Sequence, residues 1–282
     1  MIYRYFAILS LVCLLQISCN RAEYFPDKPL AFTKTVFVAH QCAGYLGKAN
    51  TLESAKLGLQ KLQAIECDIQ MSAEGSLWLS HDPNTPTCGE VTESIFPELS
   101  DSQIMSLNSC LGNVNGYSSL ESVFKFIADS MPQAIISLDV KAWVPKSIKN
   151  ANLILQMNSL AQKIIELTQA YNLENRVFVE SEVGDFLYYI RTKSSGIETY
   201  LATYGDFELG VARALNGGFT GISFKYMHKE TITKESIAAI RRKGLKIQLW
   251  TVNDTSYIKE ALQLQVDYIQ TDNINFVITL NK

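Results

Sequence analysis

Eight short apolar segments, rich in Val, Ile and Leu, most constrain the fold of this 282-residue chain. Near-continuous hydrophobic strands are typical of a sheet that is buried on both faces. Segments with helical periodicity separate them, and this alternation predicts a parallel sheet covered by helices. The expected strands are residues 35–39, 64–69, 134–140, 176–180, 199–203, 221–224, 246–251 and 267–270. The expected helices are residues 51–62, 120–129, 153–171, 184–193, 208–215, 234–242 and 256–264.

The number of strands favours a closed barrel over an open sheet. Eight β/α units in roughly 250 residues suit a TIM (β/α)8 barrel of the α/β class. No G-x-G-x-x-G follows the first strand, which argues against a dinucleotide-binding sheet. A turn at Glu74-Gly75 and the apolar run after it predict a short hairpin inserted after strand 2. We therefore expect a single barrel domain over residues 35–282.

The first nineteen residues have the pattern of a signal peptide. Arg4 precedes an apolar run over residues 5–15, which is too short for a transmembrane helix. Ser18-Cys19 resembles the end of a bacterial lipobox, although Gln16 stands where an apolar residue is usual. We expect a signal peptide with a lipobox-like end (1–19), an N-terminal tether (20–34) and an exported lipoprotein anchored to the membrane by lipidation at Cys19. The alternative is plain cleavage, which leaves a periplasmic or secreted protein.

Charge and cysteine content limit the partners and the redox environment. The 25 Lys and Arg residues are offset by 28 Asp and Glu, so no broad basic surface exists for nucleic acid. Export permits disulfides, and Cys88 and Cys110 flank one loop-rich stretch, so we expect them to pair. Cys67 lies inside an apolar strand and is expected to be a small buried hydrophobe.

Carboxylates occur at the C-terminal ends of the predicted strands, where a TIM barrel carries its reactive groups. Glu66 and Asp68 stand at i and i+2, so both point to one face of the second strand. Asp139 and Lys141 end the third strand with the same spacing. Three carboxylates supply the oxygen ligands that one hard divalent cation, Mg²⁺ or Ca²⁺, prefers, and a lysine can bind a phosphate oxygen.

Histidine is scarce in this chain, and two of its three histidines fall at the mouth of the predicted barrel, the end where the C-termini of the strands meet. His40 ends the first strand and His81 ends the hairpin, whereas His228 lies outside every motif and is expected in a surface loop. Two imidazoles beside a metal site can share general-acid and general-base work. Phosphoester chemistry is the reaction class that this set of residues indicates.

Seven motifs follow one another across nearly all of the chain after the signal segment. In order they are Ala39-His40, Asn50-Thr51-Leu52-Glu53-Ser54, Ile65-Glu66-Cys67-Asp68-Ile69, Ser80-His81-Asp82, Leu138-Asp139-Val140-Lys141, Leu249-Trp250-Thr251-Val252-Asn253 and Ile269-Gln270-Thr271-Asp272. In this order they resemble the glycerophosphodiester phosphodiesterases, of the phosphatidylinositol-phosphodiesterase-like TIM-barrel superfamily. The resemblance implies that His40 and His81 are the acid/base pair, that Glu66, Asp68 and Asp139 bind the metal, that Lys141 contacts phosphate and that Trp250 walls the substrate pocket.

The sequence departs from the pattern of that family at three positions. The usual His-Arg-Gly is His40-Gln41-Cys42 here, so Gln41 puts a neutral amide where an arginine would bind phosphate. Ala49 replaces a glutamate, and Asp139 stands where glutamate is more common. An aspartate at this position, followed two residues later by a lysine, is similar to the pattern of the sphingomyelinase D branch of the same superfamily.

Two further strand ends carry polar side chains that are candidates for substrate contact. Glu180 ends the fourth strand, where it could contact substrate or support a residue that does, and Lys225 follows the sixth. The expected activity is metal-dependent hydrolysis of glycerophosphodiesters to glycerol 3-phosphate and an alcohol. The alternatives are a lysophospholipid or sphingomyelinase D-type phosphodiesterase, which should show an apolar rim beside the mouth, and a non-catalytic ligand-binding barrel. The attacking oxygen belongs either to water or to a neighbouring hydroxyl of the substrate, and the sequence leaves both routes open.

Overall fold

The structure is a computed structural model that describes residues 25–89, 91–112, 116–142, 150–204, 206–226 and 232–280. The predicted signal peptide, with Cys19, and His228 lie outside these residues. Among the helices of the described ranges, none combines the length and the apolar character that crossing a membrane requires.

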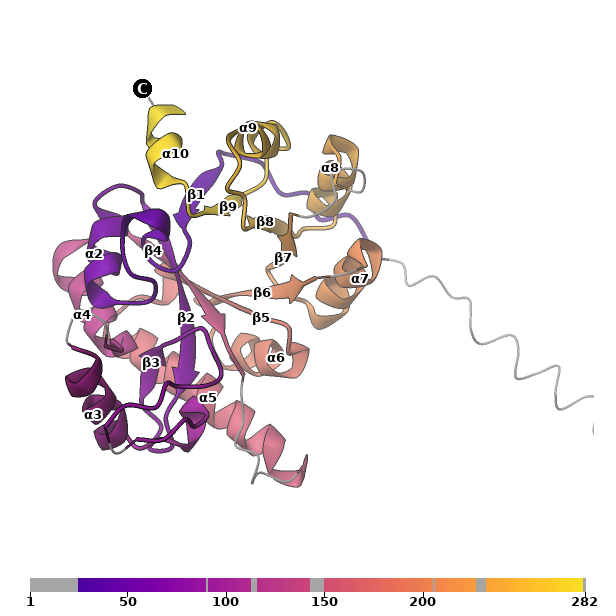
Figure 1. Ribbon diagram of the computed structural model, residues 1–282. Coiled ribbons are helices and arrows are strands. Elements are labelled where there is room, and N and C mark those ends of the chain that lie inside the picture. Colours follow the sequence, from indigo (N-terminus) through magenta and orange to yellow (C-terminus); the bar gives the residue numbers. More distant parts are fainter. Residues whose placement is uncertain are drawn as a thin grey trace, which may run out of the picture.

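Eight parallel strands close into a barrel, as the sequence predicts (Figure 1). Each strand pairs with the next, and β1 pairs with both β2 and β9, which closes the ring. The extents observed differ from those expected by one or two residues. The strands are β1 (Val36–Ala39), β2 (Ala64–Met71), β4 (Ile135–Val140), β5 (Val177–Ser181), β6 (Glu198–Thr203), β7 (Gly221–Lys225), β8 (Lys246–Trp250) and β9 (Tyr268–Thr271).

The predicted hairpin is present at the C-terminal end of β2. Strand β3 (Leu77–Leu79) pairs antiparallel with the last residues of β2, so that Leu79 lies opposite Ile69. Gly75 adopts a φ of 88° in the connecting turn, a conformation that glycine tolerates without strain. The hairpin therefore carries the residues that follow Leu79 back to the C-terminal end of the barrel.

The seven predicted helices are all present, and two more were not expected. The predicted ones are α2 (Leu52–Leu59), α4 (Leu120–Ser130), α5 (Asn150–Ala170), α6 (Gly184–Lys193), α7 (Phe207–Gly217), α8 (Lys234–Arg242) and α9 (Thr255–Gln263). The additional ones are α3 (Asp101–Leu111) and α10 (Ile274–Leu280). Helix α3 packs with η2 (Phe96–Glu98) in a small hydrophobic cluster of its own around Phe96 and Ile104. The predicted Cys88–Cys110 disulfide is present. It joins two parts of the insertion between β3 and α4, the loop before η2 and helix α3.

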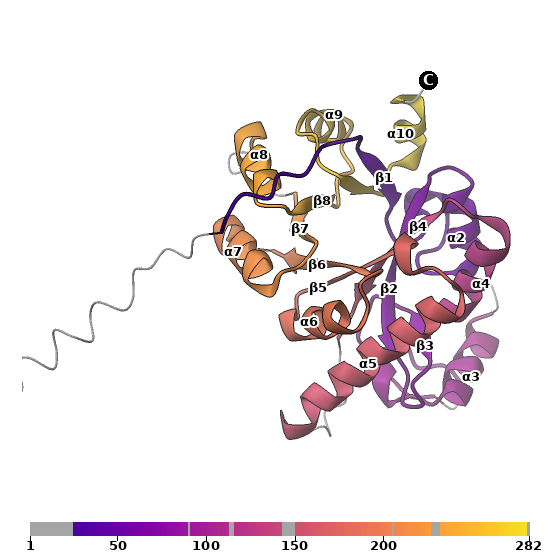
Figure 2. The same ribbon diagram turned by 180° about the vertical axis from the view of Figure 1, so that it is seen from behind.

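The described part of the segment expected to be a tether, residues 25–34, lies along α8 before it enters β1 (Figure 2). The backbone N–H groups of Lys28 and Leu30 donate to the carbonyls of Arg242 and Arg241, at 2.7 and 3.2 Å. This segment therefore reaches the barrel at the end opposite the mouth.

Candidate active site

Three carboxylates converge at the C-terminal end of two neighbouring strands. Glu66 and Asp68 project from β2 to the same side, and Asp139 on β4 lies opposite Asp68 in the strand register. One oxygen from each of the three lies within 4.8 Å of the others. Because Glu66 and Asp68 are each only 1% exposed, their charges are separated from solvent. The structure thus brings together the residues expected to bind a metal.

Two amide side chains hold these carboxylates in place. The Gln41 backbone N–H donates to Glu66 Oε2 at 2.8 Å, and its side-chain Nε2 donates to Asp68 Oδ2 at 3.1 Å. Asn50 Nδ2 donates to the same Asp68 oxygen at 2.6 Å, and Asn50 Oδ1 accepts from the Asp68 backbone N–H at 3.0 Å. Gln41, expected to contact substrate, therefore supports the carboxylates. Asn50 was given no role from the sequence, although it opens one of the seven motifs.

The cluster carries more negative charge than its protein partners offset. Lys141 Nζ lies 2.6 Å from Asp139 Oδ2 and 3.0 Å from Asp68 Oδ1. Burial would lower the pKa of Lys141, but the charges of Asp139 and Asp68 raise it, so this side chain stays protonated. Among the described residues, the ion pairs of Asp68 and Asp139 therefore come from one ammonium group, that of Lys141.

Burial and the excess charge together raise the pKa values of two of these carboxyl groups. Burial, followed by the neighbouring negative charges, raises the pKa of Glu66 well above its usual value and that of Asp139 to about 7. Glu66 Oε1 is buried and has no hydrogen-bond partner among the described residues. An all-oxygen donor set with one unsatisfied buried oxygen fits a hard divalent cation.

His40 lies beside this cluster and is held by a second carboxylate. Its Nδ1 is 2.8 Å from Asp272 Oδ1, and its Nε2 is 4.0 Å from Glu66 Oε2. Asn253 fixes Asp272 in turn, because Asn253 Nδ2 donates to Asp272 Oδ2 at 2.6 Å and the Asp272 N–H donates to Asn253 Oδ1 at 2.7 Å. In the sequence, Asp272 was only the last residue of the seventh motif and was given no role. The pairing of β1 with β9 is the signal that places it beside His40.

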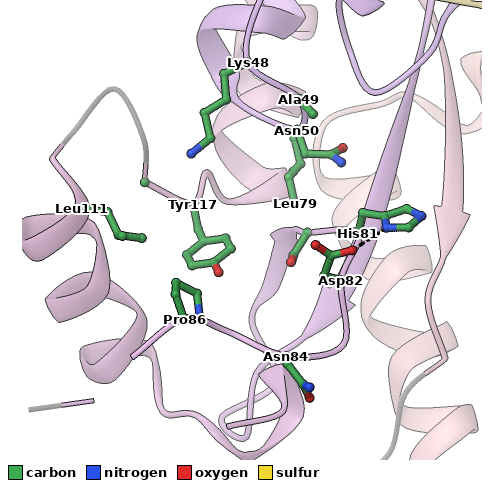
Figure 3. Close-up of a pocket in the computed structure, with 12 residues that line it drawn as sticks. Lys48, Ala49, Asn50, Leu79, His81, Asp82, Asn84, Pro86, Leu111 and Tyr117 are labelled. Atoms are coloured by element: carbon green, nitrogen blue, oxygen red, sulfur yellow. Dashed lines mark hydrogen bonds and ion pairs between the residues drawn. The ribbon is translucent and has the colours of Figure 1, made fainter. Parts of the chain in front are cut away.

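His81 follows strand β3 and lies at the edge of a cavity of about 430 Å³ (Figure 3). Its Nδ1 is 2.9 Å from Asp82 Oδ1, and its side chain is half-exposed. Asn50, which bonds to Asp68, lines the same cavity, so the cavity adjoins the carboxylate cluster. In Figure 3 the ring of His81 and the amide of Asn50 point toward the barrel strands, while Lys48 and Tyr117 line the opposite side.

An aromatic wall borders the mouth on the far side of the barrel. Trp250 ends β8 and contacts Tyr204 edge to face, with ring centroids 4.9 Å apart. Lys225 Nζ, at the end of β7, lies 5.8 Å from the centroid of the Trp250 ring. Burial and the charge of Glu182 raise the pKa of Tyr204 to about 12, so this phenol is neutral. The sequence indicated Trp250 and Lys225 for this region, but not Tyr204.

Glu180 lies too deep in the barrel to contact a substrate at the mouth. Its side chain projects into the barrel interior, and the residue is 2% exposed. Four donors from four strands saturate its two oxygens: Ser137 at 2.7 Å, Gln270 at 2.6 Å, Ser223 at 2.7 Å and Gln248 at 2.7 Å. Of the two roles expected for Glu180, the buried position fits support of neighbouring residues and not contact with substrate, and the charge of Glu180 helps to raise the pKa values of Glu66 and Asp139.

Comparison with known proteins identifies relatives over most of the chain. The model of the glycerophosphoryl diester phosphodiesterase family matches residues 40–276. An uncharacterized protein of Bacillus subtilis is 21% identical over 243 residues, which cover 84% of this chain and 95% of that protein. A glycerophosphodiester phosphodiesterase of Arabidopsis thaliana is 22% identical over 265 residues, covering 92% of this chain and 75% of that protein.

Solved structures share the fold at low sequence identity. A glycerophosphodiester phosphodiesterase from Parabacteroides distasonis aligns with a TM-score of 0.71 at 17% identity, over 89% of this chain and 99% of that one. A phosphodiesterase from Oleispira antarctica, in complex with the product sn-glycerol-3-phosphate, aligns with a TM-score of 0.72 at 13% identity, over 88% of this chain and 98% of that one.

Proposed function

Because this chain belongs to the glycerophosphoryl diester phosphodiesterase family and is thereby a phosphoric diester hydrolase, we propose that it hydrolyses glycerophosphodiesters to glycerol 3-phosphate and an alcohol. The observation that carries the proposal is the meeting of Glu66, Asp68 and Asp139 within 4.8 Å beside the His40–Asp272 pair. The structural neighbour from Oleispira antarctica is in complex with sn-glycerol-3-phosphate, which supports this product.

In the proposed reaction the two histidines move protons on opposite sides of the scissile bond. Asp272 engages Nδ1 of His40, so Nε2 is left to face the carboxylate cluster. Asp82 engages Nδ1 of His81 in the same way. A carboxylate at Nδ1 fixes the ring and stabilises the imidazolium that forms when Nε2 accepts a proton. One histidine then deprotonates the attacking hydroxyl or water, and the other protonates the leaving alkoxide.

The remaining residues of the cluster would bind the cation and the phosphate group. Glu66, Asp68 and Asp139 would hold Mg²⁺ or Ca²⁺, which when bound offsets the charge that develops on the phosphate oxygens. Lys141, which stays protonated, offers a second positive group to a phosphate oxygen. Gln41 contributes by fixing two of the carboxylates.

The cavity beside His81 is suited to the alcohol half of the substrate. Its volume of about 430 Å³ is within the range of small-molecule sites. Polar groups line it, including Lys48, Asn84 and Tyr117, as a hydroxyl-bearing headgroup requires. A proton donated from His81 would reach an oxygen at the edge of this cavity, which fits the departure of an alcohol there.

A lysophospholipid is the second candidate substrate, and one surface feature favours it. Helix α5 follows β4, so it begins on the mouth side, where its first turns project from the body of the protein (Figure 1). Leu153, Ile154 and Leu155 are exposed there, the last two at 64% and 67%. An exposed apolar patch next to a site that handles phosphodiesters suits contact with acyl chains. The proposed lipid anchor at Cys19 would keep the protein at a membrane.

A substrate panel separates these proposals. Purified protein is incubated with glycerophosphocholine, glycerophosphoinositol or lysophosphatidylcholine, each with Mg²⁺, Ca²⁺ or EDTA, and glycerol 3-phosphate and free headgroup are measured. Metal-dependent release of glycerol 3-phosphate supports the first proposal, and the absence of product from every substrate would overturn it.

A pair of surface variants tests the second candidate. Changing Ile154 and Leu155 to serine should lower activity on lysophosphatidylcholine selectively. The matched control is Leu209→Ser, because Leu209 is exposed to a similar extent, 57%, on α7. Equal activity of all variants on lysophosphatidylcholine would exclude a role for the α5 surface.

A further inference from the structure

Two cysteines that no disulfide includes face each other in the hydrophobic core, and Cys67 points to the opposite face of β2 from the carboxylates beside it. Cys42 follows β1 and Cys67 lies in β2, and both are 0% exposed. Their sulfur atoms are 3.0 Å apart, about one ångström more than the length of an S–S bond. The Cys42 N–H donates to the Glu66 carbonyl at 2.7 Å, so the two backbones already lie side by side. A bond between the sulfurs requires a shift of only about half an ångström at each.

The loop that carries Cys42 has a backbone conformation that needs support. Gln41 and Cys42 have φ values of 48° and 77°, in the left-handed region that favours glycine. Helix α2 lies directly against this loop, since a Cβ placed on Gly58 would come within 1.9 Å of the Cys42 carbonyl oxygen. A side chain at position 42 is thus held in a strained and crowded place, where its sulfur is aimed at Cys67.

The position of the pair connects it to the metal-binding residues. Gln41, next to Cys42, donates to both Glu66 and Asp68. Cys67 stands between those two carboxylates in β2. A covalent link between Cys42 and Cys67 would therefore join the loop that orients the carboxylates to the strand that bears them.

We propose that Cys42 and Cys67 form a second disulfide, closed while the chain folds by exchange with a protein or small-molecule disulfide of an oxidising compartment. The two thiols form one S–S bond through a mixed disulfide with the donor, and their two electrons and two protons convert the donor disulfide to two thiols. The Cys88–Cys110 disulfide needs the same oxidising conditions. Because both sulfurs of the new bond are sealed from solvent, it resists reductants in the folded protein, whereas Cys110 is exposed.

The direct test is a mass measurement on protein produced in an oxidising compartment. The protein is denatured with an alkylating agent and without reductant, then digested with trypsin and a glutamate-specific protease. We expect the peptide of residues 35–48 joined to that of residues 67–74. Recovery of both peptides with alkylated thiols, from protein in which Cys88 and Cys110 are joined, would overturn the proposal. A reductant added to folded protein should open Cys88–Cys110 first, and earlier opening of Cys42–Cys67 would contradict the sealed position.

We also expect the Cys42–Cys67 bond to strengthen metal binding, an expectation that rests on the proposed function. It is tested by measuring metal affinity. Cys67→Ala should weaken the affinity for Mg²⁺ or Ca²⁺ by about tenfold, the low end of the range for residues that support metal ligands. The matched control is Cys110→Ala, which breaks the disulfide in the insertion and should leave metal affinity unchanged. Because cross-link detection needs no activity, a cross-linked but inactive protein would refute the proposed function and leave the disulfide standing. Equal metal affinity of wild type and Cys67→Ala would refute the coupling.

Discussion

Replacing Glu66 with glutamine should stabilise the metal-free protein while removing its metal binding. Glu66 is 1% exposed, and its Oε1 has no hydrogen-bond partner among the described residues. The glutamine keeps an oxygen for the Gln41 N–H and places an NH₂ group at the position of Oε1, next to a cluster whose other members are Asp68 and Asp139. A buried, unsatisfied polar group costs about 1–3 kcal/mol, so we expect the free energy of unfolding in EDTA to rise by about 2 kcal/mol. For a domain of this size that is about 4–8 °C in Tm.

The pH dependence of this difference has a definite sign. The pKa of Glu66 is raised in the folded state, chiefly by burial, so the folded protein holds a proton that the unfolded chain releases at lower pH. The stability of the metal-free wild type therefore falls as pH rises through the folded pKa, whereas glutamine does not titrate. The advantage of Glu66→Gln should be larger at about pH 8.5 than at about pH 5.5.

Thermal unfolding with and without metal measures both effects. A free cation at about 100 times its Kd should stabilise the wild type by about 2.7 kcal/mol and Glu66→Gln much less. The control is Glu98→Gln, which removes one exposed carboxylate and should change neither quantity. If Glu66→Gln is less stable than wild type in EDTA at both pH values, or gains as much stability from metal, the assignment of Glu66 to the metal site is refuted.

Three other perturbations test neighbouring parts of the site. Asp272→Asn should lower kcat by about 10²-fold or more without changing metal affinity, because it weakens the support of His40; steady-state kinetics that show a change in KM alone would contradict this role. Metal affinity should rise with pH through about 7, because Asp139 must lose a proton to bind a cation; calorimetry in two buffers should detect the released proton, and its absence would contradict the raised pKa. Lys141→Met should lower stability in EDTA by about 3 kcal/mol by leaving Asp68 and Asp139 without a cation, and metal should restore more stability to this variant than to wild type; urea unfolding that shows no loss would exclude the ion pairs as a stabilising feature.

The barrel could be predicted from the sequence because its strands are buried on both faces and read as short apolar runs. Helix α3 was not predicted because serine, asparagine and glutamine, five of its eleven residues, weaken its apolar pattern, although the capping box of Ser100 and Gln103 marks its start. Helix α10 has only seven residues, too few for a periodic pattern. The helices that were missed lie outside the repeated β/α pattern or at its end.

The part of the candidate site that could be predicted from the sequence consists of polar residues at the C-terminal ends of strands. That rule brought His40, Glu66 and Asp139 to one mouth, but it does not tell how deep a side chain lies. Glu180 ends a strand in the sequence and yet points into the barrel interior, where four neutral donors satisfy it. The residues that support the site, such as Asp272 beside His40, depend on which loops lie next to each other in the folded chain. No local pattern in a single sequence predicts those contacts.

The most direct test of the account is phosphorus NMR of glycerophosphodiester hydrolysis by wild type and His81→Ala, with metal affinity measured on both proteins. His81 is half-exposed and bonds only to Asp82 among the described residues, so its loss should leave the fold and the carboxylate cluster intact. We predict metal-dependent formation of glycerol 3-phosphate by wild type, and a loss of at least about 10²-fold in His81→Ala at unchanged metal affinity. Near-normal turnover in His81→Ala, or wild-type turnover that persists in EDTA, would contradict acid/base catalysis by histidine at a metal-bound carboxylate site.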